Sequence, residues 1–321
     1  FCEPAVKTAD SAAPVFRLAG VALHLARGVA TAALVFPFLD KAQRVNRIRR
    51  WSARLLRILA IHLEISGTPP IGATAPVMIV ANHVSWLDIY AINTVRAARF
   101  IAKSEVRRWP MIGWFCEQAG TFFVERARKR HTAQINEQVA AALMQGDTVA
   151  VFPEGTTTAG DVVLPFHASL LQPALKCDAL LYPVAIRYTR ADGSLCSEAD
   201  YQGDKSFLDT LSLMVTQPVI YAKLQFLPPP TCTGKRRCEL AHEAAQLIAS
   251  ALDVPAPRSR RLESNAANSV VSDGELAPAH SQAAYASAAR KWQVVPAMAI
   301  RLLRAIRQNA PCRTADPRLG R

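Results

Sequence analysis

Short apolar runs alternate with stretches of helical periodicity between residues 70 and 254. Apolar runs of about four to eight residues between turn residues are typical of buried strands, and apolar residues recurring every three or four positions predict helices. The predicted strands are 77–81, 99–102, 121–124, 148–152, 180–186 and 219–226. The predicted helices are 85–96, 105–118, 131–145, 168–176, 207–215 and 236–252. This alternation predicts an α/β fold in which helices flank a mostly parallel central sheet, with functional groups where strands end and helices begin.

An apolar segment, residues 18–39, precedes this region and is long enough to span a bilayer. Arg27 near its middle opposes insertion, because a central arginine costs about 2.5–3.5 kcal/mol and each leucine or valine returns only about 0.3–0.6 kcal/mol. A single span and a helix lying in one leaflet therefore both stay open. In a spanning arrangement, the basic residues that follow would keep residue 41 onward on the cytoplasmic side.

Residues 41–60 predict a basic amphipathic helix without any acidic residue. Its basic residues are Lys41, Arg44, Arg47, Arg49, Arg50, Arg54 and Arg57. Its apolar stripe consists of Val45, Ile48, Trp51, Leu55 and Leu59. Such a helix can rest on an anionic membrane surface or pack its stripe on the protein, and the unpaired arginines favour the membrane.

These patterns divide the chain into three parts. Residues 1–66 are expected to form membrane-associating helices, 67–254 a catalytic domain and 255–321 a flexible basic tail rich in Pro, Ala, Ser and Asn. Within the tail, residues 292–306 have the periodicity of an amphipathic helix, and a disordered tail is the alternative.

The chain has 321 residues, of which 38 are Lys or Arg and 25 are Asp or Glu, for a net charge of +13. This excess indicates an anionic partner: a lipid surface, a phosphorylated substrate or nucleic acid. The basic residues lie largely on predicted helices with apolar faces, which disfavours nucleic acid. Seven scattered cysteines without a C-x-x-C pair indicate a reducing compartment, and the nucleotide-binding and serine-hydrolase signatures G-x-G-x-x-G, Walker and G-x-S-x-G are absent from the sequence.

The sharpest chemical signal is the segment 82–88, Asn-His-Val-Ser-Trp-Leu-Asp, between a predicted strand and a helix. His83 and Asp88 suit a general-base dyad, in which the carboxylate holds one ring nitrogen and the other removes a proton from a hydroxyl. The alternative for Asp88 is structural, because Ser85 and Asp88 have the spacing of a helix capping box.

Two further motifs lie at the ends of predicted strands. Phe-Pro-Glu-Gly-Thr at 152–156 carries Glu154 at the mouth of the sheet, and its glycine lets backbone N–H groups approach an anion; a turn with a solvated glutamate is the alternative. The other motif runs from Gly120 to Arg126. An arginine at the end of a buried strand suits phosphate recognition, and an ion pair with Glu125 is the alternative.

The ordered motifs His-x4-Asp, Gly-x-Phe-Phe-Val-Glu-Arg, Phe-Pro-Glu-Gly-Thr and Tyr-Pro-Val-Ala at 182–185 resemble the four blocks of the glycerolipid acyltransferases. The resemblance covers about residues 75–190 and is of the 1-acylglycerol-3-phosphate O-acyltransferase type. It implies a glycerol-3-phosphate acyltransferase-like fold and transfer of a fatty acyl chain from a thioester to a lysolipid hydroxyl. The acceptor that it most directly implies is 1-acylglycerol-3-phosphate, which gives phosphatidic acid in phospholipid biosynthesis.

The same resemblance assigns roles to residues. His83 is expected to be the base and Asp88 its orienting partner. The expected substrate-binding residues are Lys103, Gly120, Glu125, Arg126, Glu154, Gly155, Thr156 and Pro183. The expected partners are a lysolipid acceptor, acyl-CoA or acyl-carrier protein as donor, and an anionic membrane surface at the cytoplasmic face, with no bound cofactor, metal or nucleic acid.

One position departs from the family pattern. Many phosphate-specific members have an arginine after Phe-Pro-Glu-Gly-Thr, and this chain has Thr157. The difference raises lyso-ornithine lipid, or another lysophospholipid, as the alternative acceptor. A nucleic-acid-binding protein and a catalytically silent membrane scaffold are the more remote alternatives.

Overall fold

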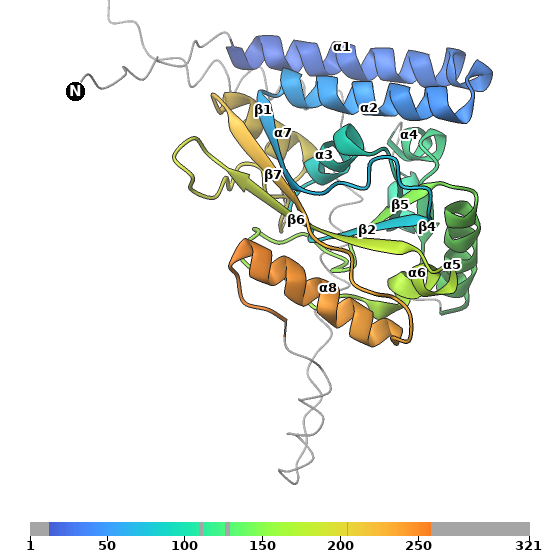
Figure 1. The fold of residues 1–321 in the computed structure, drawn as a ribbon. Helices are drawn as coiled ribbons and strands as arrows, with labels where there is room; N and C mark the ends of the chain where they lie inside the picture. Colours follow the sequence, from blue (N-terminus) through green and yellow to red (C-terminus); the bar gives the residue numbers. More distant parts are fainter. Residues whose placement is uncertain (1–12, 109–111, 126–128, 204, 258–321) are drawn as a thin grey trace, which may run out of the picture. The chain divides into compact units, whose positions relative to one another are not determined.

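The computed structural model describes residues 13–108, 112–125, 129–203 and 205–257. From Pro14 onward they belong to one compact unit, Pro14–Asp273 (Figure 1). A second unit, Phe1–Ala13 with Gly274–Arg321, falls almost entirely outside the described residues, as do Arg126 and the predicted tail helix.

Within the described residues, a seven-stranded sheet has the order β1-β7-β6-β2-β5-β3-β4. The strands are β1 (Ile61–Gly67), β2 (Val77–Ala81), β3 (Arg99–Lys103), β4 (Phe122–Val124), β5 (Thr148–Val151), β6 (Leu180–Thr189) and β7 (Ile220–Phe226). All neighbouring strands pair in parallel except β6 and β7, which are antiparallel. The predicted mostly parallel α/β sheet is therefore confirmed.

Helices cover both faces of this sheet (Figure 1). The α-helices are α1 (Ala13–Leu34), α2 (Lys41–Ile58), α3 (Leu87–Val95), α4 (Ile112–Gln118), α5 (Lys129–Met144), α6 (Gln172–Lys176), α7 (Phe207–Thr216) and α8 (Arg237–Leu252). The short 3-10 helices are η1 (Phe36–Phe38), η2 (Ser104–Arg108) and η3 (Ala168–Leu171). The predicted helix 105–118 is divided into η2 and α4, and the sequence carries Pro110, which a helix interior tolerates poorly, in the interval between them.

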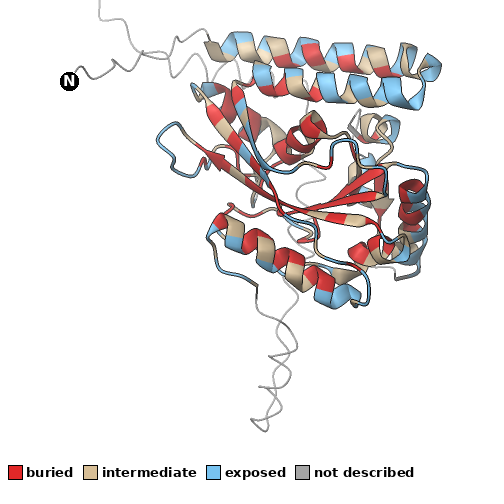
Figure 2. Cartoon of the chain, in the orientation of Figure 1, coloured by how far each residue is buried: buried red, intermediate tan, exposed pale blue. Residues whose placement is uncertain are grey.

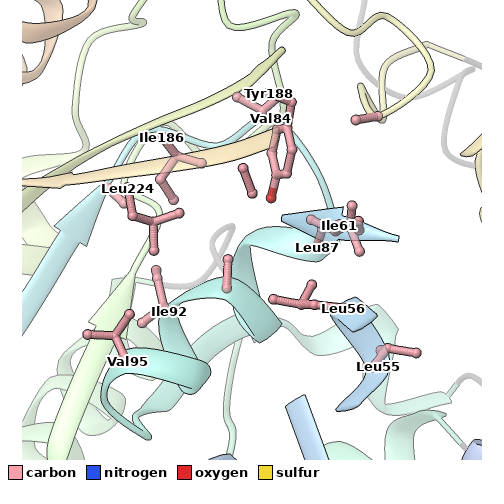
Figure 3. Close-up of a cluster of buried hydrophobic side chains, with 14 of the residues drawn as sticks. Leu55, Leu56, Ile61, Val84, Leu87, Ile92, Val95, Ile186, Tyr188 and Leu224 are labelled. Carbon is pink, nitrogen blue, oxygen red and sulfur yellow. The ribbon is translucent and has the colours of Figure 1, made fainter. Parts of the chain in front are cut away.

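The two faces of β2 explain why its sequence is a continuous apolar run. Val77, Ile79 and Ala81 point into a core shared with α1, α2, α3 and α7. Met78 and Val80 point into a second core shared with α5, α6 and α8. Because successive side chains of a strand face opposite ways, a strand buried on both sides needs apolar residues at every position. Figure 2 shows this buried centre, and Figure 3 shows part of the first core.

β1 was not predicted, and residues 61–66 were assigned with the N-terminal helices. In the structure they pair with β7 and form an edge of the sheet. His62, Glu64 and Ser66 are all exposed on this strand. An edge strand with one half-exposed face lacks the apolar run that reveals a central strand, which explains the omission.

The apolar stripe of α2 packs on the protein, which corrects the prediction that it rests on a membrane. Leu55 and Leu59 are buried in the first core, and Trp51 stacks on His24 of α1 with ring centroids 4.7 Å apart. The helix starts at a capping box in which Asp40 accepts a hydrogen bond from the Gln43 amide. Its exposed residues include Arg47, Arg50, Arg54 and Arg57.

α1 has the length and apolar composition to cross a bilayer, the one such helix among the residues that the structure describes. It buries Val21, His24, Gly28 and Ala32 against the protein. Its other face is exposed and mostly apolar, with Arg27 also exposed. The large exposed apolar side chains there and in η1 are Val15, Phe16, Leu23, Leu34 and Phe38.

Candidate active site

The predicted motifs follow adjacent parallel strands. His83 follows β2, Glu154 follows β5, Lys103 ends β3 and Glu125 follows β4. These four strands are neighbours in the order β2-β5-β3-β4 and run in the same direction. Their carboxyl ends therefore define one edge of the sheet, here called the carboxyl edge, which is where α/β folds gather functional groups.

His83 and Asp88 form the expected pair. His83 Nδ1 lies 2.7 Å from Asp88 Oδ2, and that same oxygen accepts hydrogen bonds from the backbone amides of Val84 at 2.8 Å and Ser85 at 3.0 Å. The Asp88 side chain is fully buried, whereas that of His83 is 21% exposed. The buried carboxylate can accept only, so Nδ1 carries the proton and Nε2 is left as the basic nitrogen.

The capping-box alternative is half realised. Asp88 Oδ2 does accept the Ser85 amide hydrogen bond, as a capping box requires. However, α3 begins at Leu87, with Trp86 as its N-cap and no side-chain cap. The Ser85 hydroxyl is buried without a hydrogen-bond partner among the described residues. Asp88 therefore orders the loop and holds the imidazole with the same oxygen.

The plane of the imidazole is fixed by stacking. The His83 ring lies on Phe152 with centroids 4.1 Å apart and ring planes 9° apart. Phe152 opens the Phe-Pro-Glu-Gly-Thr segment. No described residue makes a hydrogen bond to His83 Nε2, so this nitrogen is available to a substrate hydroxyl.

Glu154 is buried, so the alternative of a solvated glutamate is wrong. Its Oε1 accepts the backbone amide of His83 at 2.9 Å and its Oε2 that of Leu164 at 3.2 Å. Burial raises the pKa of Glu154 to about 7, against the opposing effect of these two hydrogen bonds. The Thr158 amide also donates to the His83 carbonyl at 2.8 Å. Glu154 of the Phe-Pro-Glu-Gly-Thr segment and the nearby Thr158 thus bind the backbone amide and carbonyl of His83.

Other predicted residues occupy the same edge in different ways. The Gly155 amide closes a turn onto the Phe152 carbonyl, and Gly155 itself has φ +79°, a left-handed conformation that glycine adopts without steric cost. Thr156 is exposed, and Lys103 and Glu125 are half-buried. The Glu125 amide donates to His131 Nδ1 at 2.9 Å.

Two predicted residues are not brought to the dyad. Gly120 precedes β4 at the opposite, amino edge of the sheet, where its carbonyl accepts from Arg99 Nε at 2.7 Å. Pro183 is buried within β6 opposite Val80, and its carbonyl accepts from the Leu227 amide. Both residues have structural explanations, backbone conformation for the first and sheet pairing for the second.

Two residues at the site were missed in the sequence. Asn82 is fully buried and exchanges two hydrogen bonds with the backbone of Ile186, at 2.9 and 2.8 Å. Tyr188 donates its hydroxyl to Asp88 Oδ1 at 2.8 Å. A polar residue directly after an apolar strand was a usable signal for Asn82. The Tyr188 contact spans 100 residues and had no local signal.

Comparison with known proteins agrees with this geometry. A sequence model of the acyltransferase family matches residues 62–187. The chain is 37% identical over 209 residues to a lyso-ornithine lipid O-acyltransferase from Pseudomonas aeruginosa, covering 65% of this chain and 79% of that protein. It is 37% identical over 172 residues to a 1-acyl-sn-glycerol-3-phosphate acyltransferase from Neisseria gonorrhoeae, covering 54% of this chain and 67% of that protein.

The fold is also similar to a crystal structure, that of the 1-acyl-sn-glycerophosphate (LPA) acyltransferase PlsC from Thermotoga maritima. The TM-score is 0.56 at 19% identity, over 75% of this chain and 93% of that chain.

An α/β sheet with a His-Asp pair at its carboxyl edge and these relatives define an acyltransferase. The chain belongs to the acyltransferase family, and within it to the 1-acyl-sn-glycerol-3-phosphate and lysolipid acyltransferases. The predicted family, fold class and general activity in lipid biosynthesis are thereby confirmed.

Proposed function

We propose that this enzyme transfers a fatty acyl group from a thioester to the hydroxyl of a lysolipid, with His83 as the general base. The observation that carries the proposal is the buried Asp88 carboxylate on His83 Nδ1, with Nε2 unpartnered among the described residues. Nε2 takes the proton of the acceptor hydroxyl as its oxygen attacks the thioester carbonyl. The C–O bond forms, the C–S bond breaks, and the imidazolium returns the proton to the departing thiolate.

The base is tested with His83→Ala. Turnover should fall by about three orders of magnitude or more, because the proton of the attacking hydroxyl would have no acceptor. The thermal unfolding temperature should change little, since the ring is part-exposed. Near-normal turnover in a folded His83→Ala enzyme would eliminate the proposed mechanism.

For the acceptor, lyso-ornithine lipid is supported over 1-acylglycerol-3-phosphate, the acceptor that the motifs most directly implied. Thr157 stands where many phosphate-specific relatives have arginine, and its hydroxyl donates to the Tyr201 carbonyl. It therefore offers no positive charge to a phosphate. At the same 37% identity, the match to the Pseudomonas lyso-ornithine lipid O-acyltransferase covers 65% of the chain and the match to the Neisseria gonorrhoeae 1-acyl-sn-glycerol-3-phosphate acyltransferase 54%, and this difference in coverage supports the same choice.

A panel of lysolipid acceptors, read by mass spectrometry on purified enzyme, tests the acceptor. Higher kcat/KM on lyso-ornithine lipid is the expected result, and a clear preference for 1-acylglycerol-3-phosphate would reverse the choice. Thr157→Arg should shift the ratio toward the phosphate acceptor. Thr156→Arg, with the same charge on the neighbouring exposed residue, is the matched control and should shift it less.

The donor is proposed to be acyl-CoA or acyl-carrier protein. Both supply the thioester that the mechanism consumes, and the assay compares them at equal acyl chain length. Turnover without any added acyl thioester would instead indicate a transacylase that moves chains between phospholipids.

We further propose that the enzyme binds the cytoplasmic face of the membrane through the exposed apolar face of α1. Phe16, Leu23 and Leu34 are 73%, 53% and 71% exposed there. The exposed arginines of α2 supply attraction for anionic lipid. Whether α1 lies in one leaflet or spans both is decided by protease access to the segment before Pro14 in sealed vesicles.

Flotation with phosphatidylglycerol vesicles tests membrane binding. Phe16→Glu combined with Leu23→Glu should abolish flotation, because two charges would enter the apolar layer. Met144→Glu, at an exposed apolar residue of α5, is the control and should leave flotation unchanged. Retention on RNA or DNA in place of vesicles would favour the nucleic-acid alternative.

A further inference from the structure

β6 runs past the end of β2 and lies alongside the loop that carries the base. The pairing of the two strands ends at Ala81 opposite Val184, while β6 continues to Thr189. Asn82 bonds the backbone of Ile186, and two residues further along β6 the side chain of Tyr188 meets Asp88. The part of β6 beyond Val184, here called the overrun of β6, therefore contacts the catalytic loop 82–88 at both ends of that loop.

The two oxygens of Asp88 have different partners. Oδ2 accepts from His83 Nδ1 and from two backbone amides. Oδ1 accepts from the Tyr188 hydroxyl at 2.8 Å, which is its one hydrogen bond from the described residues. Asp88 is 0% and Tyr188 2% exposed, so water has little access to this contact.

The Tyr188 hydroxyl can act only as a donor here. Burial and the nearby Asp88 carboxylate raise the pKa of Tyr188 well above its ordinary value, so the phenol stays protonated. In Figure 3 its ring extends from β6 with the oxygen directed toward α3. A donor on Oδ1 prevents rotation of the carboxylate about its Cβ–Cγ bond and thereby fixes the direction in which Oδ2 faces the imidazole.

We propose that Tyr188 is a positioning residue whose hydroxyl holds the Asp88 carboxylate, and through it the His83 imidazole, in the orientation for proton transfer. The inference rests on the proposed roles of His83 and Asp88. Tyr188 is 2% exposed and its hydroxyl bonds Asp88, so its effect on the reaction is expected to pass through the carboxylate.

The hydroxyl is removed alone in Tyr188→Phe, which keeps the ring in the core. Turnover should fall about tenfold, the size expected for one hydrogen bond to a charged group. KM for the acyl thioester should stay within about twofold, because the residue does not contact substrate. Tyr221→Phe, a half-buried phenol of β7, is the matched control and should keep wild-type turnover.

A pH profile separates positioning from mere packing. Without the phenol, the charge of Asp88 is shared by fewer hydrogen-bond donors and attracts the imidazolium more strongly, which favours the protonated base in the variant. The acidic limb of kcat/KM should therefore move to higher pH in Tyr188→Phe, and the loss of activity should be larger at pH 6 than at pH 8. A turnover loss without displacement of this limb would overturn the inference.

Two measurements keep the result decisive where the variant is destabilised. NMR titration of the His83 ring in the folded fraction, assigned by its absence in His83→Ala, should show the same upward displacement independently of any acyl transfer. In an Asp88→Asn background, Tyr188→Phe should change the remaining turnover less than twofold. A further tenfold loss there would show that Tyr188 acts independently of Asp88.

Different results would contradict the proposed mechanism and the inference about Tyr188. Normal turnover of His83→Ala would overturn both the proposed mechanism and this inference. An inactive His83→Ala together with wild-type turnover, pH profile and ring titration in Tyr188→Phe would overturn the inference alone.

Discussion

The two edges of the sheet both carry charged residues, but they use them differently. At the amino edge, where β3 and β5 begin, Arg96 donates to Thr148 Oγ1 at 2.6 Å and Arg99 bonds the Gly120 carbonyl and Asp147. Arg96, Arg99, Asp147 and Thr148 line a cavity of about 270 Å³. At the carboxyl edge, the buried polar groups converge on one imidazole whose Nε2 lacks a partner among the described residues.

The comparison teaches that charge and a cavity do not by themselves mark a reactive site. At the amino edge, Arg96 bonds the Thr148 hydroxyl and the Pro70 carbonyl, and Arg99 bonds the Gly120 carbonyl and Asp147, so both charges stabilise the fold. At the carboxyl edge, every bond around His83 leaves one basic atom oriented and unused. Substitutions that remove the His83–Asp88 contact should therefore lower turnover, whereas substitutions at the amino edge should lower the free energy of unfolding.

The largest expected difference comes from a matched pair of Asp→Asn substitutions. Asp88→Asn should lower kcat about 10³- to 10⁴-fold, because the imidazole loses the carboxylate that sets its tautomer and stabilises its protonated form. Asp147→Asn at the amino edge should keep turnover within about twofold of wild type, because it lies at the far end of the strands. Steady-state kinetics on both variants measure this difference in kcat. Comparable losses of kcat would mean that the two edges are not functionally distinct.

The next effect is on the pH dependence of stability. Burial gives Glu154 a pKa of about 7 in the folded protein, against an unfolded value of about 4.3. The folded state thus retains a proton that the unfolded state loses, so this group stabilises fully below about pH 4.3 and its contribution is lost as the pH rises through about 7. Glutamine does not titrate, so Glu154→Gln lacks this pH-dependent contribution to the free energy of unfolding.

Urea unfolding at pH 5, 6 and 7 tests this sign. The free energy of unfolding of Glu154→Gln relative to wild type should rise by about 2–3 kcal/mol over that range. Subtracting the wild-type free energy of unfolding from that of the variant at each pH cancels the contributions of all other titrating groups, because both proteins contain them. Parallel pH dependence of the two proteins would contradict a neutral, buried Glu154.

A smaller effect is expected at the glycines of the amino edge. Gly120 has φ +75°, and a Cβ there would approach Arg99 Nε within 2.8 Å. Gly120→Ala should cost about 1–3 kcal/mol of unfolding free energy, from backbone strain and from displacement of Arg99. Gly146→Ala, at φ +76° with nothing within 4 Å of a Cβ, isolates the strain alone. Equal losses in both would remove any role for the Arg99 contact.

The smallest effect concerns the two ion pairs of Asp147. Its Oδ1 lies 2.6 Å from Lys41 Nζ, and its Oδ2 lies 2.9 Å from Arg99 Nη1. Because Lys41 is 55% exposed and Arg99 34% exposed, solvent screens both pairs. Asp147→Asn should lower the free energy of unfolding by about 1 kcal/mol or less, and less still at high salt. A salt-independent loss above about 3 kcal/mol would require a buried role for this carboxylate.

Local patterns in the sequence predicted the parts of the site that are themselves local. His83 and Asp88 are five residues apart after an apolar run, and the structure joins them. The predicted strand 121–124 already placed Gly120 before a strand and Glu125 after it, and only the family resemblance assigned Gly120 to the substrate site. An apolar face fits a membrane and a protein core equally well, and the α2 stripe was assigned to lipid because the arginines of this segment have no acidic residue beside them in the sequence. Tyr188 depends on a strand pairing between distant segments.

The overrun of β6 also has a consequence for when the enzyme becomes competent during synthesis. A chain that has been made only to residue 180 already contains His83, Asp88 and Glu154, but not Ile186 or Tyr188. The base loop then lacks its two anchors on β6. Activity should therefore begin abruptly, after β6 has left the ribosome and paired with β2, and not gradually as the motifs appear.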